Sequence, residues 1–223
     1  MCLAIMQPKS YRVPNTVLSK GWESNRDGAG LAYCVNGEVR IVKGIFDLLD
    51  LIRTYEQIDT DQTPVLLHLR NAMYGIRCSG NTHPFWITPR RLALVHNGTI
   101  QMDRPRDSRR SDSWHMARTL RSWIDPEAVP TVEMMDLISK AVGPTNSIAW
   151  LDWSGNTTIL GEDRGYWSDG IWYSNESYYE TRTNVPRMGA DPSVCWSCGS
   201  ALSAHGEVIS GYCRPCLKEF ATI

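Results

Sequence analysis

Apolar and polar residues alternate from Ala29 to Lys43, on both sides of the dipeptide Asn36-Gly37. Alternation with a period of two is typical of a half-buried strand, and Asn-Gly favours the type I′ turn of a two-residue hairpin. The pattern therefore predicts a β-hairpin. In the next stretch, 44–58, apolar residues recur at helical spacing, which predicts a helix that covers one face of the hairpin. The apolar positions of this helix are Ile45, Leu48, Leu49 and Ile52.

Two short apolar runs, 64–70 and 91–96, are bounded by glycine, proline or asparagine and predict strands. Ser111 then precedes a helical pattern with Asp112 in its first turn, so we expect Ser111 to be the N-cap of a second helix. A third helix is predicted over 132–142. Further strands are predicted over 146–153, 157–160 and 170–174. Strands, then helices, then strands again indicate an α+β fold with mostly antiparallel sheets, not a doubly wound parallel sheet.

The composition of the 223-residue chain fits one large domain, with or without a small appendage. Its 23 basic and 24 acidic residues nearly balance, so net charge gives no reason to expect a polyanion or a membrane surface as main partner. No apolar run approaches the roughly 20 residues of a membrane span, and the first residues lack the pattern of a signal peptide. We therefore expect a cytoplasmic protein. No glycine-rich phosphate-binding motif supports nucleotide binding.

Four of the seven cysteines form two Cys-x-x-Cys pairs: Cys195 with Cys198, and Cys213 with Cys216. Two such pairs bring four thiolates around one tetrahedral zinc ion, whereas disulfides are disfavoured in a reducing compartment. The sequence predicts one structural zinc ion in a zinc ribbon, residues 193–223, behind a linker, residues 186–192. The charges of the ribbon balance, so a protein partner is favoured and nucleic acid is possible but not favoured.

The chain begins MCLAIM, with a cysteine directly behind Met1. Removal of Met1 would leave an α-amine and a thiol on Cys2, so that one residue carries both a general base and a nucleophile. The alternative is a buried first strand in which Cys2 is only a small apolar side chain.

Four later stretches bear on this choice. They are NRDGAGLAY at 25–33, LLHLRNAMYG with SGNTHPF within 66–85, LALVHNGTI at 92–100 and SDSWHMARTL at 111–120. In this order, behind Cys2, they resemble the class II glutamine amidotransferase domain, an N-terminal-nucleophile hydrolase. The resemblance implies a domain over residues 2–185 with a four-layer αββα fold and antiparallel sheets. It also implies hydrolysis of the side-chain amide of glutamine through a γ-glutamyl thioester.

By the same resemblance, Cys2 is the nucleophile, and the Asn97 side chain and the Gly98 N–H are the oxyanion donors. Arg70 matches the arginine that binds the carboxylate of glutamine, and Asp112 matches the aspartate that receives its α-ammonium. Two alternatives remain open from the residues alone. Asn97-Gly98 also suits a hairpin turn, and Asp112 also suits the first turn of a helix.

Asn81 and His83 match the Asn-x-His-Pro turn of the family and complete the expected substrate-binding set. We expect His83 to order this loop and not to act as a base. His68 and His96 lie in apolar strand sequence, where a core histidine is the commoner explanation.

Asn71 departs from the family pattern, because synthetase-linked members often have tryptophan after the arginine. No second catalytic domain is recognisable, so ammonia made here must diffuse or pass to a separate protein, and we expect a separate partner synthase. Two other functions remain open: a γ-glutamyl amide hydrolase acting on another substrate, and a catalytically inactive scaffold whose zinc ribbon binds a protein or nucleic acid.

Overall fold

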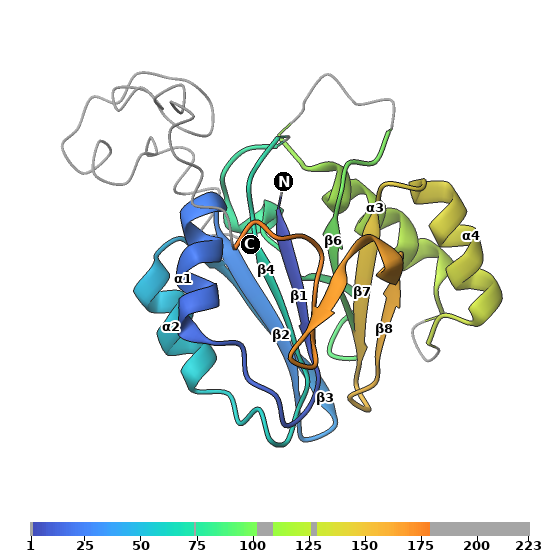
Figure 1. The fold of residues 1–223 in the computed structure, drawn as a ribbon. Coiled ribbons are helices and arrows are strands. Elements are labelled where there is room, and N and C mark those ends of the chain that lie inside the picture. Colours follow the sequence, from blue (N-terminus) through green and yellow to red (C-terminus); the bar gives the residue numbers. More distant parts are fainter. Residues whose placement is uncertain (1, 74, 102–108, 126–128, 179–223) are drawn as a thin grey trace.

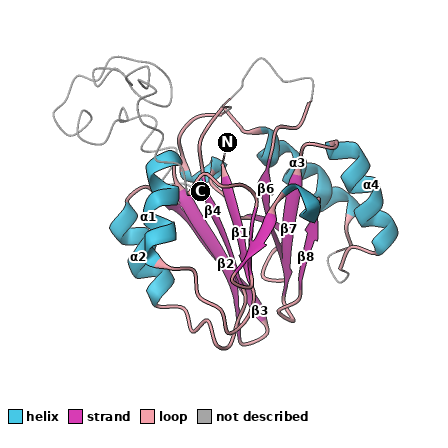
Figure 2. Ribbon diagram, in the orientation of Figure 1, coloured by secondary structure: helices cyan, strands magenta, loops and turns pink. Residues whose placement is uncertain are grey.

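The computed structural model describes residues 2–73, 75–101, 109–125 and 129–178. Within these ranges the protein has a mixed helix and strand fold with two β-sheets (Figures 1 and 2). Every strand pairing in this part of the chain is antiparallel. The prediction of an α+β fold with antiparallel sheets is therefore confirmed.

The first sheet has six strands in the order β3-β2-β4-β1-β10-β9, and the second has four in the order β5-β6-β7-β8. The strands of the first sheet are β1 (Leu3–Gln7), β2 (Ala29–Val35), β3 (Glu38–Ile45), β4 (Val65–Leu69), β9 (Tyr166–Ser168) and β10 (Ile171–Tyr173). Those of the second sheet are β5 (Phe85–Thr88), β6 (Leu92–Asn97), β7 (Ser147–Asp152) and β8 (Thr157–Leu160).

The described ranges contain four α-helices and two short 3₁₀ helices. They are α1 (Asn15–Ser24), α2 (Leu48–Glu56), α3 (Asp112–Trp123), α4 (Val132–Val142), η1 (Ser79–Asn81) and η2 (Glu162–Arg164). None of the helices in these ranges has the length and apolar character needed to cross a membrane.

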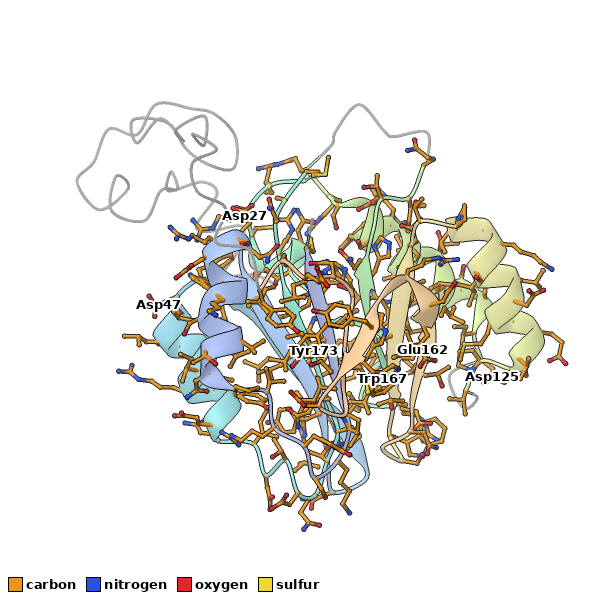
Figure 3. All side chains as sticks on the ribbon, in the orientation of Figure 1. Asp27, Asp47, Asp125, Glu162, Trp167 and Tyr173 are labelled. Atoms are coloured by element: carbon orange, nitrogen blue, oxygen red, sulfur yellow. The ribbon has the colours of Figure 1, made fainter. Side chains whose placement is uncertain are left out.

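Three apolar clusters hold the elements together. Helices α1 and α2 pack on the outer face of the first sheet through residues such as Leu18, Leu51 and Leu67. Helices α3 and α4 pack on the outer face of the second sheet. The inner faces of the sheets meet in a third cluster, which includes Leu66 and Val95. Side chains fill the spaces between the helices and the two sheets (Figure 3).

The predicted hairpin is β2-β3. Its strands pair from Ala29 with Ile45 to Val35 with Glu38. Asn36 and Gly37 have φ angles of 53° and 73°, and two positive φ angles in succession are what a type I′ turn requires. The turn prediction is therefore confirmed.

The predicted helix 44–58 is shorter than expected. Strand β3 continues to Ile45, and Gly44 lies within it at a φ of 75°, a conformation that glycine adopts readily. Helix α2 begins only after Asp47, whose carboxylate accepts hydrogen bonds from two N–H groups of the first turn. Its buried face carries Leu51 and Tyr55, whereas Leu49 is 59% exposed. The prediction of Leu49 on the buried face was wrong.

The pattern of the sequence did not predict helix α1 or strands β5 and β9. Helix α1 contains Gly21 in its buried face, and glycine is normally unfavourable inside a helix. A Cβ at Gly21 would lie 2.9 Å from Cδ2 of Leu3, so glycine lets α1 lie close over β1. The need for glycine comes from this packing and not from local propensity.

The other predicted elements lie within about two residues of the observed ones, apart from the predicted linker (186–192) and zinc ribbon (193–223). Both of these lie outside the described residues.

Candidate active site

Several segment ends meet at one edge of the two facing sheets. Strands β1 and β4 are antiparallel and Leu3 pairs with Leu69, so Cys2 lies beside the residues that follow β4. Strand β6 of the facing sheet ends at Asn97, and α3 begins at Asp112. The fold therefore gathers four parts of the chain that are far apart in sequence.

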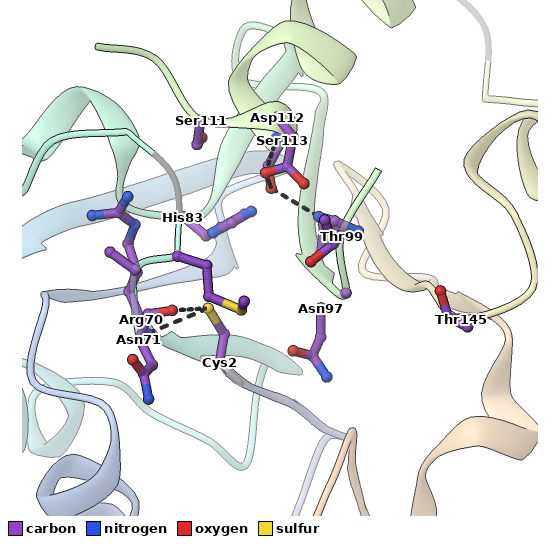
Figure 4. Close-up of a pocket in the computed structure, with 14 residues that line it drawn as sticks. Cys2, Arg70, Asn71, His83, Asn97, Thr99, Ser111, Asp112, Ser113 and Thr145 are labelled. Carbon is purple, nitrogen blue, oxygen red and sulfur yellow. Dashed lines mark hydrogen bonds between the residues drawn. The ribbon is translucent and has the colours of Figure 1, made fainter. Parts of the chain in front are cut away.

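A cavity of about 170 Å³ lies at this edge (Figure 4). Six of the seven predicted catalytic and substrate-binding residues line it: Cys2, Arg70, His83, Asn97, Gly98 and Asp112. The residues not predicted are Asn71, Ala72, Met73, His96, Thr99, Ser111, Ser113 and Thr145. Asn81 is not among the lining residues.

Cys2 is held from two sides. The N–H of Asn71 donates a hydrogen bond to Sγ at 3.3 Å, and the thiol lies 3.4 Å from the carbonyl oxygen of Asn71. The side-chain amide of Asn175 donates to the carbonyl oxygen of Cys2 at 2.6 Å. Burial raises the pKa of the Cys2 thiol, and the Asn71 hydrogen bond and the nearby charge of Arg70 only partly oppose this. At neutral pH the thiol is therefore protonated and needs a base to become a nucleophile.

Gly98 follows Asn97 in a conformation that few other residues adopt. Its φ is 139°, and a Cβ at this position would lie 2.2 Å from Oδ1 of Asn146. The Asn97 side chain is 7% exposed, and its Oδ1 is buried with no hydrogen-bond partner in the described part of the protein. Because buried polar atoms normally have partners, this oxygen favours a polar group bound in the cavity.

Asp112 is fixed by backbone donors. One carboxylate oxygen accepts from the N–H of Ile100 at 2.8 Å, and the other accepts from the N–H of Ser113 at 2.9 Å. The hydroxyl oxygen of Ser111 accepts from the N–H of Trp114, so the prediction of Ser111 as N-cap is confirmed. The cap places a nearly buried carboxylate at the wall of the cavity.

Arg70 and Asn81 both bind the loop between β4 and η1. The guanidinium of Arg70 donates to the carbonyl oxygens of Ile76 and Gly75 at 3.1 and 3.3 Å. The amide of Asn81 donates to the carbonyl of Ile76, and its oxygen accepts from the N–H of Ser111. Asn81 thus connects the loop to the start of α3. Its substrate-binding role stays a prediction, like the roles of the lining residues.

Three histidines lie together at the cavity, of which His83 and His96 line it. The ring centroids of His68 and His83 are 3.9 Å apart, and those of His83 and His96 are 6.3 Å apart. Burial lowers the pKa of each ring, and that of His68 falls to about 3. The three rings are therefore neutral at pH 7, and a neutral, buried His83 suits a wall of the cavity.

Sequence patterns account for only some of the remaining residues around the cavity. Asn175 belongs to a Ser-Asn-Glu stretch at 174–176, which is not one of the four stretches that carry the resemblance. Ser113 adjoins Asp112 in a recognised motif. Thr145 and Asn146 follow a Gly-Pro turn at the start of a predicted strand, and nothing in that pattern points to a cavity.

The described residues contain no group of three or more histidine, cysteine, aspartate or glutamate side chains placed to hold a metal ion. The four cysteines of the predicted zinc site, Cys195, Cys198, Cys213 and Cys216, lie outside the described residues.

Comparison with known proteins gives partial similarity. No protein-family profile matches the chain. The glutamine–fructose-6-phosphate aminotransferase [isomerizing] of Pyrococcus horikoshii is 31% identical over 75 residues, and that of Bacteroides thetaiotaomicron is 34% identical over 76 residues. Each match covers 34% of this chain and 12% of the relative, so the chain spans about 12% of the length of these relatives.

Among solved structures, a glutamine phosphoribosylpyrophosphate amidotransferase from B. subtilis, complexed with ADP and GMP, aligns with 80% of this chain and 43% of its own. The TM-score is 0.49 and the sequence identity is 12%. The similar proteins are thus glutamine aminotransferases or amidotransferases by name.

Proposed function

We propose that this protein hydrolyses the side-chain amide of glutamine with Cys2 as an N-terminal nucleophile, in the manner of a class II glutamine amidotransferase domain. The observation that carries the proposal is the cavity itself. The thiol of Cys2 lies in one cavity with the Asp112 carboxylate, the Arg70 side chain and the Asn97-Gly98 segment. The partial similarity to glutamine–fructose-6-phosphate aminotransferases supports the same assignment.

Each of these groups answers a need of the substrate. A free amino acid with a side-chain amide presents an ammonium, a carboxylate and a carbonyl that becomes an oxyanion during attack. Asp112 suits the ammonium, and the guanidinium of Arg70 suits the carboxylate. The side-chain amide of Asn97 and the N–H of Gly98 suit the oxyanion, and one such donor is typically worth about 3 kcal/mol of barrier.

The reaction needs the α-amine of Cys2 to be free, and therefore needs Met1 to be removed. The amine accepts the thiol proton as Sγ attacks the side-chain carbonyl carbon of glutamine. The oxyanion intermediate then collapses, the C–N bond breaks, and ammonia leaves with the proton returned by the α-ammonium. Water hydrolyses the remaining γ-glutamyl thioester to glutamate and restores the thiol.

The helix–sheet–sheet–helix packing supports a four-layer αββα fold of the N-terminal-nucleophile hydrolases. We further propose that the ammonia is delivered to a separate synthase. The thiolate donor set of Cys195, Cys198, Cys213 and Cys216 suits one structural zinc ion, and a zinc ribbon there would serve to dock a protein partner.

The test combines intact-mass spectrometry with a glutaminase assay. Purified protein is expected to lack Met1, to release glutamate and ammonia from glutamine, and to gain one adduct from an electrophilic glutamine analogue. Cys2→Ala should abolish turnover and labelling while the melting temperature stays within a few degrees. Cys34→Ala is the matched control, because Cys34 is also a partly buried free cysteine but lies outside the cavity.

Protein that retains Met1 and still releases ammonia at the same rate would overturn the mechanism. Labelling of Cys2 without turnover of glutamine, together with turnover of another γ-glutamyl amide, would change the substrate and keep the nucleophile.

A further inference from the structure

A buried chain of hydrogen bonds runs through Asn146, His96 and Ser113, of which His96 and Ser113 line the cavity. The ring of His96 lies 2.8 Å from Oδ1 of Asn146 through Nε2, and 2.8 Å from Oγ of Ser113 through Nδ1. His96 and Asn146 are each 2% exposed, and Ser113 is 4% exposed. The three side chains come from β6, from the segment before β7 and from α3, so the chain spans separate elements.

The direction of each hydrogen bond follows from the partners of Asn146. Its Nδ2 donates to the carbonyl oxygen of Val142 at 2.6 Å, which turns Oδ1 toward His96. Nε2 of His96 must therefore carry a proton and donate it to Oδ1. Burial lowers the pKa of His96 and keeps the ring neutral, so Nδ1 carries no proton and accepts from the Ser113 hydroxyl.

The Asn146 end of the chain supports the oxyanion segment. Oδ1 of Asn146 lies where a Cβ of Gly98 would be, at 2.2 Å from that position. Asn146 is thus in direct contact with the backbone of Gly98, whose N–H is the proposed oxyanion donor. The Asn146 side chain therefore restricts where the backbone of Gly98 can lie.

The Ser113 end of the chain supports the carboxylate that is proposed to bind ammonium. The N–H of Ser113 donates to Oδ1 of Asp112 at 2.9 Å, and Oγ of Ser113 lies 3.4 Å from the same oxygen. The 2.8 Å contact between Oγ and Nδ1 of His96 is shorter, so the Ser113 hydroxyl donates its hydrogen to Nδ1 and not to Asp112. The side chain of Ser113 is thereby fixed beside Asp112.

We infer that His96 is a positioning residue that holds the two ends of the substrate pocket separately, the oxyanion segment through Nε2 and the Asp112 carboxylate through Nδ1. The inference rests on the proposed glutaminase function. The oxyanion forms only during the reaction, so the Nε2 side of His96 acts on kcat. The ammonium is present in the bound substrate throughout, so the Nδ1 side acts on KM.

Two substitutions at one position separate these effects. In His96→Gln the side-chain amide nitrogen reaches about as far as Nε2, so it can still donate to Asn146 while the acceptor for Ser113 is lost. We expect KM for glutamine to rise roughly tenfold with kcat within about twofold of the wild type.

In His96→Asn the amide oxygen lies near the place of Nδ1, so Ser113 keeps its acceptor. We expect kcat to fall roughly tenfold with KM little changed.

A matched pair of serine substitutions keeps the inference testable if a His96 variant does not fold. Ser113 and Ser147 are both 4% exposed, but Ser147 does not line the cavity and its hydroxyl donates to the carbonyl of Gly161. Its backbone pairs with that of Asn97, and alanine keeps this pairing. Ser113→Ala should raise KM as His96→Gln does, and Ser147→Ala should change neither kcat nor KM. Both comparisons use the full chain with free glutamine.

Equal changes of kcat and KM in the two His96 variants, or equal kinetics of Ser113→Ala and Ser147→Ala, would overturn the inference and leave the proposed function standing. A wild-type protein that neither turns over glutamine nor is labelled at Cys2 would remove the proposed function and the inference with it.

Discussion

The environment of Cys2 determines which form of the thiol would take part in the proposed reaction. Burial raises its pKa, so thiolate is not the resting form at neutral pH. A free α-amine ordinarily has a pKa of about 8, and it is attached to the same residue. The base is therefore available in a pH range where the thiol still holds its proton.

The pH dependence of kcat/KM follows from this order. Below about pH 7 the α-amine is protonated and cannot accept the thiol proton, so activity should be low. Activity should rise as the amine loses its proton and then stay level, because the raised pKa of the thiol lies higher. Initial rates with glutamine from pH 5.5 to 9.5 test this. A rise centred above pH 9 would instead show that preformed thiolate is the reactive species.

Arg70 and Asn97 should affect different kinetic constants. The guanidinium of Arg70 donates from two nitrogens to two loop carbonyls, and the single ammonium of a lysine cannot reproduce this geometry. Arg70→Lys should therefore raise KM for glutamine about tenfold or more.

Asn97→Ala should lower kcat roughly 100-fold by removing an oxyanion donor. Steady-state kinetics separates the two, and an effect of Asn97→Ala on KM alone would end its oxyanion assignment.

Among the secondary-structure elements, the three buried histidines connect the two sheets. His68 lies on β4, and its Nε2 donates a hydrogen bond to the carbonyl oxygen of His96 on β6 at 3.1 Å. His83 lies between them, before β5. The pKa of each is lowered by burial, so folding keeps these rings neutral.

This burial predicts a loss of stability in mild acid. A histidine in the unfolded chain has a pKa of about 6.5, so below that pH the unfolded state binds protons that the folded state does not. Stability should be fully present above about pH 6.5. It should fall with decreasing pH, by up to about 1.4 kcal/mol per pH unit for each histidine, until the lowered folded pKa is reached. For His68 that value is about 3.

Denaturant titrations at several pH values between 7.5 and 4.5 measure the slope. This slope reports how many protons the protein takes up when it unfolds. His68→Gln should lower that number by about one relative to the wild type, because carboxylates contribute equally to both proteins. An unchanged slope would mean that His68 is already accessible to protons in the folded protein.

The sequence predicts an element well when the residues that determine it are neighbours along the chain. The β2-β3 turn and the start of α3 follow from neighbouring residues, Asn36-Gly37 and Ser111, and both were predicted correctly. Asn146 forms a hydrogen bond with His96, which is 50 residues away in sequence, and Asn175 forms one with Cys2, which is 173 residues away. No local pattern encodes such contacts, so the motifs predicted six residues that line the cavity but neither Asn146 nor Asn175.

In the molecule as a whole, the apolar core of the described residues extends to Tyr178. Strand β10 pairs with β1 next to Cys2, and Tyr173 and Tyr178 belong to the cluster under α1 and α2. Among the described residues, those that line the cavity lie between Cys2 and Thr145. The fold and the proposed chemistry therefore have their described contacts within residues 2–178.

A chain that ends at Pro192 should accordingly fold and hydrolyse free glutamine with kcat and KM within about twofold of the full chain, because it retains the whole described core.

Metal analysis of the full chain should give one zinc ion per protein. That ion should be absent from the shortened chain and from Cys198→Ser, but present in Cys34→Ser, whose cysteine belongs to β2.

If the ribbon docks a synthase, shortening should uncouple ammonia release from the acceptor reaction and leave glutamine hydrolysis intact. A shortened protein with an unchanged melting temperature but no activity would show that residues beyond Pro192 build part of the active site, and the division at 186–192 would then be wrong.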